Sequence, residues 1–365
     1  MTSQKLYEIA LTLVPGIGDV NGKKLVAYCG GAEAVFCEKK KALTRIDGIG
    51  DNMIRFLDSK EVMQRAEEEL KFIEKNGIKP LFYLDQDYPK RLQHCHDSPM
   101  MLYYKGNADL NVPKVVGVVG TRNITDYGRY VTEKIIEDLS VDNVMIISGL
   151  AYGVDATAHR AALKYDLATV GVLGHGLQTI YPAANRKLST NILEKGGVLT
   201  EFVSGTQPDR ENFPKRNRIV AGMVDCLIVV ESALKGGAMI TADIANSYDR
   251  EVFAVPGKIG DIYSEGCNQL IKINKANLVT CATDIRYVMR WDVDTKVVAK
   301  QMRMFRDFSE EEKKVIDVFD NKNVVHLDDI IVGTDLSPSK IASVLLSLEF
   351  DGVLTALPGK RYQKL

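Results

Sequence analysis

The pattern of apolar and polar positions divides the chain into three zones. Between residues 80 and 290, short β-branched and apolar runs alternate with stretches of helical periodicity. Strands buried on both faces are almost continuously apolar, so this alternation predicts an α/β, doubly wound, mostly parallel sheet covered by helices on both sides. The predicted strands are Val115–Val119, Val144–Ile147, Ala168–Leu173, Val198–Glu201, Cys226–Val230, Val252–Val255 and Leu278–Val279.

Two similar turns interrupt the helical pattern of the first zone. Residues 14–18 and 46–50 share the order apolar–x–Gly–apolar–Gly, which is typical of a helix-hairpin-helix. Glycines allow the tight turn and leave backbone amides exposed at the start of the second helix, where a phosphate oxygen binds readily. The residues that would contact phosphate are Gly16, Gly18, Lys23, Gly48 and Gly50. A role in packing alone remains open, because aspartates flank the second turn.

The third zone predicts three helices and a small hairpin. A capping box opens the first helix at Ser309, the second begins at Leu327, and the third spans 338–350 with one apolar face. Residues 353–363 would form a hairpin around a Pro-Gly turn. This order is typical of a winged-helix domain. Its third helix has only Lys340 as a cation, so protein contact or domain packing is favoured over reading DNA.

The zones predict four segments along the chain. They are a helical helix-hairpin-helix domain over 1–75, a sheet domain over 76–290, a linker over 291–308 and a winged-helix domain over 309–365.

Composition narrows the class of protein. The chain has 365 residues, 45% of them apolar, and a formal net charge of −1, so affinity for nucleic acid would have to come from local patches. No apolar run approaches the ~20 residues that span a bilayer, and the N-terminus lacks a signal-peptide core, so no membrane partner is expected. Six cysteines without a C-x-x-C pair indicate reduced thiols and a cytoplasmic protein.

One histidine-rich segment suggests metal chemistry at first sight. His94-Cys95-His96-Asp97 brings three ligand types together, but adjacent side chains rarely converge on one ion, and no second cluster lies near in sequence. We expect no metal site here.

Three cations and an asparagine follow one another in the string Phe213-Pro214-Lys215-Arg216-Asn217-Arg218. Pro214 suits the first turn of a helix, and the apolar residues 219–221 predict that the helix is buried beyond the string. The N–H groups at a helix N-terminus favour an anion, and cations clustered there would repel one another unless a polyanion bound. We interpret the string as a phosphate-binding site; a solvated basic turn is the alternative.

Glycine-rich loops follow several predicted strands. Gly120-Thr121-Arg122 follows the first strand, Ser148-Gly149 the second, and residues 235–241 lie beyond the fifth. Ligands bind at the carboxyl edge of such sheets, where glycine allows close backbone approach. Ser148 and Thr241 offer hydroxyls near helix starts, and Arg122 offers a fork suited to phosphate.

Several enzyme classes are disfavoured by what these loops lack. The first strand is not followed by G-x-G-x-x-G, and the chain has no G-x-x-x-x-G-K-[ST], which argues against a dinucleotide enzyme and a P-loop ATPase. No catalytic residue is predicted. Glu201 and Glu231 end strands near the loops, and they leave a nucleotide-binding enzyme of the nucleotide hydrolase or phosphoribohydrolase kind as the rival interpretation.

Taken together, these motifs resemble the DNA-processing protein A family (DprA, also called Smf). The resemblance covers roughly residues 80–290 closely and the flanking domains in kind. The matching strings are Gly120–Arg122, Ser148–Asp155, Tyr181–Asn185, Phe213–Gly222, Gly237–Ala242, Ala254–Gly257 and Gly266–Ile271.

The resemblance implies an extended Rossmann-like core without catalytic activity or cofactor. It also implies a homodimer, formed through that core, that binds and protects single-stranded DNA and loads RecA recombinase during natural transformation. The DNA-binding residues implied are Arg122, Ser148, Gly149, Asn185, Phe213, Lys215, Arg216, Asn217, Arg218, Gly236, Gly237 and Thr241.

The chain departs from the family pattern in three places. Gly236-Gly237-Ala238 stands where the family often has Ser-Gly-Ser, so phosphate contact there would depend more on backbone amides. Tyr152 occupies a position that is frequently basic, and Gln178 replaces the usual Asp before Tyr-Pro.

Overall fold

The computed structural model describes residues 3–291, 308–320 and 322–364, except for the side chain of Asn52. The predicted linker over 291–308 lies outside the described residues apart from its two ends.

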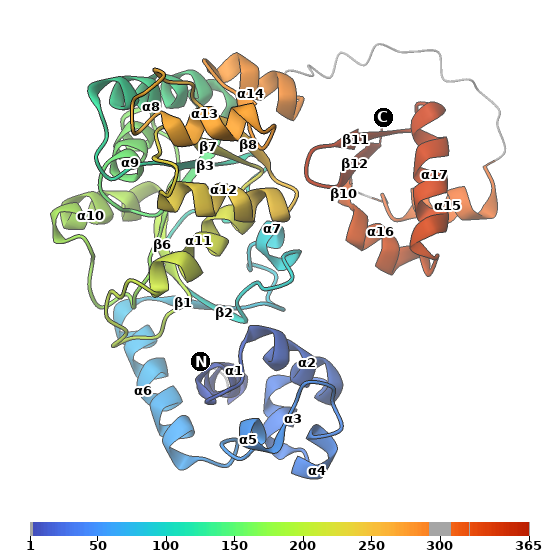
Figure 1. The fold of residues 1–365 in the computed structure, drawn as a ribbon. Coiled ribbons are helices and arrows are strands. Elements are labelled where there is room, and N and C mark those ends of the chain that lie inside the picture. Colours follow the sequence, from blue (N-terminus) through green and yellow to red (C-terminus); the bar gives the residue numbers. More distant parts are fainter. Residues whose placement is uncertain (1–2, 292–307, 321, 365) are drawn as a thin grey trace.

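A nine-stranded sheet forms the centre of the molecule, in the order β1-β2-β6-β5-β4-β3-β7-β8-β9 (Figure 1). The strands are β1 (Lys79–Phe82), β2 (Met101–Gly106), β3 (Val115–Val119), β4 (Met145–Ser148), β5 (Thr169–Val172), β6 (Gly197–Thr200), β7 (Cys226–Val229), β8 (Glu251–Ala254) and β9 (Asn277–Leu278). Strands β3 to β9 are mutually parallel, whereas β2 pairs antiparallel with β1 and with β6. The predicted fold class is confirmed, and every predicted strand is present within one residue of its expected bounds.

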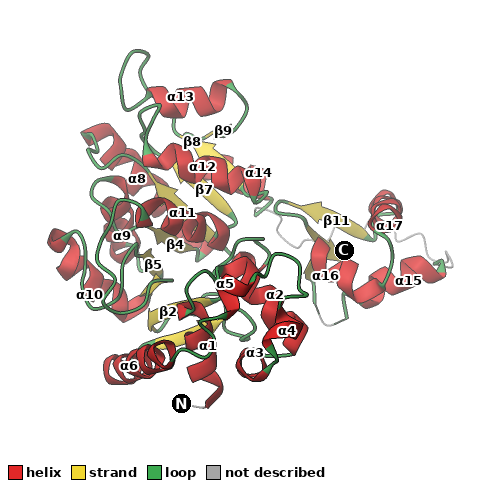
Figure 2. Cartoon of the chain, turned by 60° about the horizontal axis from the view of Figure 1, so that its bottom comes forward, coloured by secondary structure: helices red, strands yellow, loops and turns green. Residues whose placement is uncertain are grey.

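Helices cover both faces of this sheet, as a second view shows (Figure 2). The helices of this part are α7 (Lys90–Gln93), α8 (Asp126–Leu139), α9 (Val154–Lys164), α10 (Arg186–Lys195), α11 (Asn212–Met223), α12 (Gly237–Ser247), α13 (Glu265–Lys272) and α14 (Ala282–Met289), with short 3-10 turns η1 (Ser140–Asp142) and η2 (Ala183–Asn185). Alternate residues of each strand enter different cores. Val115 and Val119 pack with α11, α12 and α13, whereas Val116 and Val118 pack with α8, α9 and α14.

The direction of winding reverses at the central strand. From β3 the chain builds the sheet outward through β4 and β5 on one side, and from β7 through β8 and β9 on the other. The loops after β3, β4 and β7 therefore diverge at one edge, and such a switch point leaves a crevice at the carboxyl ends of the strands.

The N-terminal helices share a core with the antiparallel edge of the sheet. They are α1 (Ser3–Leu13), α2 (Asp19–Cys29), α3 (Ala32–Cys37), α4 (Lys40–Leu43), α5 (Asp51–Ile54) and α6 (Lys60–Asn76). Phe82, Met101 and Tyr103 from β1 and β2 are buried among their apolar side chains. In the two turns, Gly16 and Gly48 have φ values of 85° and 84°, a left-handed conformation that glycine adopts without strain.

The C-terminal part is a winged helix with its own core. It consists of α15 (Glu310–Asp317), β10 (Val324–His326), α16 (Leu327–Thr334), α17 (Pro338–Phe350), β11 (Leu354–Leu357) and β12 (Arg361–Lys364). The capping box at Ser309 is present, and β10 is a third strand that the pattern did not predict. No single helix of the described ranges is long and apolar enough to cross a membrane. Helices α16 and α17 pass such a test only as a pair bent by 114°.

Polar contacts attach this winged helix to the sheet domain. The buried carboxylate of Asp225 accepts two hydrogen bonds of 2.8 Å from Arg91 and lies 3.0 Å from Arg361 of β12. The imidazole rings of His94 and His326 stack with their centroids 3.9 Å apart.

Candidate nucleic-acid interface

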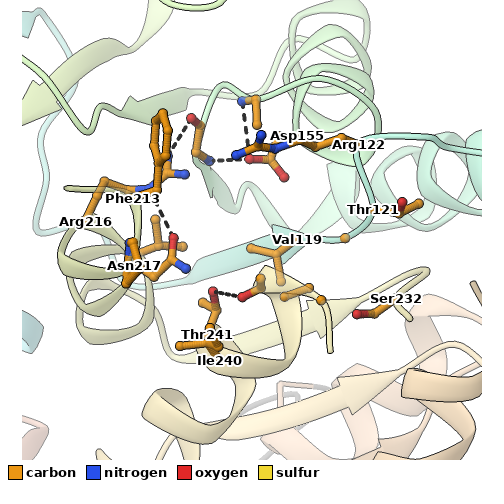
Figure 3. A pocket seen from close by; sticks show the side chains of 18 of the residues that line it. Val119, Thr121, Arg122, Asp155, Phe213, Arg216, Asn217, Ser232, Ile240 and Thr241 are labelled. Atoms are coloured by element: carbon orange, nitrogen blue, oxygen red, sulfur yellow. Dashed lines mark hydrogen bonds between the residues drawn. The ribbon is translucent and has the colours of Figure 1, made fainter. Parts of the chain in front are cut away.

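A cavity of about 810 Å³ opens at the switch point of the sheet (Figure 3). The loops after β3, β4 and β7 form its walls, together with the N-terminal turns of α11 and α12. We call this cavity the pocket. The sequence predicted a ligand site at this edge, and the structure brings the predicted loops together there.

Arg122 and two aromatic rings form a column at the mouth of the pocket. Arg122 is exposed, and its guanidinium lies 5.4 Å from the centre of the Phe213 ring. Tyr181 stacks on Phe213 at 6.0 Å. Rings and guanidinium planes of this kind are surfaces on which unpaired bases stack.

The start of α12 contributes backbone donors to the pocket. Gly236 is the N-cap, no side chain caps the helix, and the Cβ position of Gly237 has no atom within 4 Å. The first N–H groups of the helix therefore lie in an open, electropositive position that suits an anion. Thr241 also lines the pocket, but its hydroxyl donates to the Gly237 carbonyl at 3.1 Å.

Arg216 and Asp155 are buried at the base of the pocket. Arg216 donates to the Gly149 and Val172 carbonyl oxygens, and the Asp155 carboxylate accepts from the Gly149 and Ala151 amides. Burial raises the pKa of Asp155 while the nearby Arg216 lowers it. A Cβ atom on Gly149 would lie 2.0 Å from the Arg216 guanidinium, which explains the glycine. Arg216 was expected to bind DNA, and in the structure its guanidinium is held by backbone carbonyl oxygens at the base of the pocket.

The other two cations of the basic string do not line the pocket. Phe213, Arg216 and Asn217 lie on the face of α11 that lines it, whereas Lys215 and Arg218 lie elsewhere on the helix. Lys215 is exposed, as expected. Arg218 pairs with Glu201 and with Asp19 of α2, so this cation joins the sheet domain to the N-terminal helices, contrary to the expectation of a phosphate contact.

Two further residues expected on the pocket floor have internal roles. The Ser148 hydroxyl is fully buried and donates to the Val118 carbonyl at 2.6 Å. Asn185 is also buried and donates to the carbonyl oxygens of Leu150 and Ala151. Both side chains donate their hydrogen bonds to backbone carbonyl oxygens inside the protein, and neither residue lines the cavity. They support the loop after β4.

The first helical turn motif is used for packing in this structure. Asp19, directly after Gly18, accepts from the Met100 amide at 2.8 Å. Lys23 donates to the carbonyl and hydroxyl oxygens of Ser98, so its cation is engaged and not free for phosphate as expected.

The second turn motif packs against the first. Lys24 donates to the Asp47 carbonyl, and Gly50 caps the four-residue helix α5. Of the two roles left open by the sequence, these contacts favour packing over phosphate contact.

The two glutamates of the rival enzyme interpretation lie outside the pocket. Glu231 accepts from the amide and hydroxyl of Thr125 at the start of α8. Glu201 faces Arg218, and burial raises its pKa to about 7. Among the described residues that line the pocket, the only carboxylate is Asp155, which backbone amides hold. Neither glutamate of the enzyme interpretation therefore lies in the pocket.

Sequence reasoning missed Arg210 and Asn123, which also line the pocket. Arg210 lies between Asp209 and Glu211, so this short segment has no net positive charge and does not stand out as basic in the sequence. Asn123 follows Arg122 directly, so the glycine-rich pattern after β3 could have been extended by one residue to find it.

In the structure, the histidine segment lies beside residues that are far away in the sequence. His94, His326 and Asp328 place ligand-capable atoms within 4.8 Å of one another. A metal ion lies in the plane of a coordinating imidazole, whereas these rings are stacked face to face at 15°. This geometry serves stacking, and the expectation of no metal site stays a prediction.

Comparisons with known proteins agree with the motifs. The family model described as DNA recombination-mediator protein A matches residues 79–290, and one described as DprA winged helix domain matches residues 307–360. The chain is 32% identical to Protein Smf of Synechocystis over 99% of both chains. It is 43% identical to DNA processing protein DprA of Streptococcus pneumoniae over 55% of this chain and 71% of that protein.

Two solved structures are similar as well. An X-ray structure of DNA processing protein A from Streptococcus pneumoniae matches with a TM-score of 0.66 and 36% identity, over 77% of this chain and 97% of that one. A structure that addresses the single-stranded DNA binding mode of DNA processing protein A from Helicobacter pylori matches with a TM-score of 0.54 and 29% identity, over 59% of this chain and 96% of that one.

Proposed function

The chain belongs to the DNA recombination-mediator protein A (DprA/Smf) family, and from this premise we propose that it binds single-stranded DNA in the pocket without catalysing a reaction. The observation that carries this proposal is the combination of Arg122 stacked on Phe213 with the uncapped start of α12. The first offers a guanidinium and an aromatic surface, and the second offers backbone amides to a phosphate.

The shape of the pocket favours a single strand over a duplex. A cavity between loops accommodates unpaired bases, whereas a duplex is read by a long helix or ribbon in its major groove. The winged helix supplies no such basic helix: Lys340 of α17 pairs with Glu311 at 2.6 Å.

We predict that Arg122→Ala weakens binding of oligothymidylate by about tenfold or more, because a hydrogen bond to a charged group contributes about 1.5–3 kcal/mol. Lys215→Ala should weaken binding as well, since Lys215 is exposed beside the pocket-lining residues of α11. Fluorescence anisotropy with labelled oligothymidylate at several salt concentrations measures both effects. Affinity should fall steeply with salt.

The control variant is Lys272→Ala, which removes an exposed cation on α13 that does not line the pocket. It should bind like the wild type. A hairpin duplex should bind more weakly than oligothymidylate. Unchanged affinity in the Arg122 and Lys215 variants, or a preference for the duplex, would contradict the proposed site.

We extend the proposal to protection of the bound strand and RecA loading during natural transformation, by a homodimer in the cytoplasm. Family membership supports this extension. The sheet domain also exposes apolar side chains beyond β8, where Ile259 is 93% and Ile262 60% exposed, and a second copy would bury them. Light scattering of the purified chain and of Ile259→Ser/Ile262→Ser tests the dimer. A RecA-dependent strand-exchange assay tests the loading.

A further inference from the structure

Two shallower hollows continue from the mouth of the pocket across the outer surface of α8, α9 and α10. The first, of about 580 Å³, shares Arg122 and Asn123 with the pocket. The second, of about 500 Å³, shares Arg160 with the first. The three cavities therefore adjoin in series, from the carboxyl edge of the sheet to α10, which lies at the left of Figure 1. We call the two outer hollows the flank track.

The charge of the flank track differs sharply from that of the whole chain. The chain has 48 acidic and 47 basic residues, yet none of the residues that line these two hollows is acidic. The basic residues that line them, all exposed, are Arg122, Arg129, Arg160, Lys164 and Lys187.

Most of these cations have no anionic partner. Arg129, Arg160 and Lys187 form no ion pair with any residue in the described part of the chain, whereas Lys134 and Lys195 on the same helices pair with Asp138 and Asp166. Cations from three helices that line one path without counter-charges repel one another. A polyanion along that path would remove the repulsion.

An aromatic side chain interrupts the row of cations. Tyr152, in the loop between β4 and α9, lines the first hollow together with Arg129 and Arg160, and 47% of its surface is exposed. A row of cations with an exposed ring beside it is the pattern of sites that bind single strands without sequence preference, in which bases stack and phosphates meet the cations.

We infer that a single strand held in the pocket passes over Arg122 and continues along the flank track. Its phosphates lie near Arg129, Arg160 and Lys187, and one base stacks on Tyr152. This inference rests on the proposed function and adds a second segment to the same binding site. It assigns to the flank track the nucleotides that extend beyond the pocket.

The test compares a short with a long oligothymidylate, of about 4 and about 16 nucleotides, the two ends of the range that single-strand-binding folds cover. Arg160→Glu should weaken binding of the long oligonucleotide by about tenfold or more. It should also lower the slope of log affinity against log salt by about 0.7 for each phosphate that the variant no longer neutralises. The short oligonucleotide, which fits the pocket alone, should bind as in the wild type. Lys272→Glu is the matched charge reversal outside the track and should change neither.

A second pair of variants tests the stacking. Tyr152→Ala should weaken binding of the long oligonucleotide by about fivefold or more, whereas Tyr152→Phe should retain it, because stacking needs the ring and not the hydroxyl. Arg160 and Tyr152 are both exposed, so the unfolding temperatures of the variants should match that of the wild type.

The outcomes separate this inference from the proposed function. If the wild type binds neither oligonucleotide, the proposed function fails, and this inference with it. If the wild type binds both and Arg160→Glu affects neither, or weakens both equally, the pocket stands and the flank track is overturned.

Discussion

Arg216 and Asp155 are two buried charged residues that shape the wall of the pocket. Arg216 joins the loop after β4 to the end of β5 through the carbonyl oxygens of Gly149 and Val172. Asp155 holds the same loop through two amides. The wall of the pocket therefore depends on two charged side chains that are almost fully inside the protein.

We expect Arg216→Ala to lower the free energy of unfolding by about 2–5 kcal/mol, because it leaves two buried carbonyl oxygens without a donor, each at a cost of about 1–3 kcal/mol. Arg122→Ala should change that free energy by less than about 0.5 kcal/mol, since Arg122 is exposed. Urea denaturation of the two variants measures the difference. An Arg216 variant as stable as the wild type but unable to bind DNA would instead make Arg216 a direct contact.

The basic string shows that the sequence alone does not reveal the role of each side chain. Lys215, Arg216 and Arg218 are neighbours along the chain, but successive residues of a helix point about 100° apart. One cation therefore enters the core, one reaches the N-terminal helices and one faces solvent. The string marks a helix that lines the pocket. The role of each side chain depends on partners that are far away in sequence.

At the scale of elements, Glu231 connects the end of β7 to the start of α8. Its carboxylate accepts from the amide and hydroxyl of Thr125, the N-cap residue, whose hydroxyl also accepts from the Gly128 amide. A Cβ atom on Gly128 would lie 2.4 Å from the carboxylate, so this glycine makes room for it.

Glu231→Gln should destabilise the protein by about 1–2 kcal/mol, because it replaces charge-assisted hydrogen bonds by weaker neutral ones. It should leave binding of oligothymidylate unchanged. Chemical denaturation and anisotropy measure the two effects, and Arg129→Ala on the outside of α8 is the stability control. If the wild type released bases from nucleoside monophosphates and Glu231→Gln abolished that turnover, the enzyme interpretation would return.

The parallel strands could be predicted from the sequence, whereas β1 and β10 could not. Strands β3 to β8 are apolar on both faces, and helical segments separate them. β1 begins at an exposed lysine and contains Pro80, which removes a donor and suits only an edge strand. β10 has three residues, and only its pairing with β12 defines it. Such short strands are defined by long-range contacts, and a local sequence pattern does not reveal these contacts.

At the scale of the whole molecule, the winged helix is attached through groups that respond to pH. Burial lowers the pKa of His326 to about 4 and also lowers the pKa of His94. Arg250 lowers both pKa values further, while Asp328 and Asp329 raise them. The stacked pair is therefore neutral at pH 7.

We predict that docking of the winged helix weakens as the pH falls from about 6.5 towards 4. In this range each histidine binds a proton in the undocked state that it does not bind in the docked state. Protonation therefore favours undocking of the winged helix. Docking is fully retained above pH 6.5. Small-angle scattering should show a larger radius of gyration at pH 5 than at pH 7.5.

A His94→Phe/His326→Phe variant keeps two stacked rings that do not titrate, and its radius should vary less with pH. Circular dichroism at both pH values checks that the domains stay folded. Equal radii for the wild type at pH 5 and 7.5 would contradict the prediction.

The docked winged helix lies on the flank of the sheet domain that faces away from α9 and α10 (Figures 1 and 2). The winged helix exposes the apolar side chains of Val332 and Phe350 to solvent. A strand laid along α9 and α10 would leave the winged helix uncovered. A strand on the flank track and a second molecule on the winged helix would then occupy different surfaces, so both could be bound at the same time.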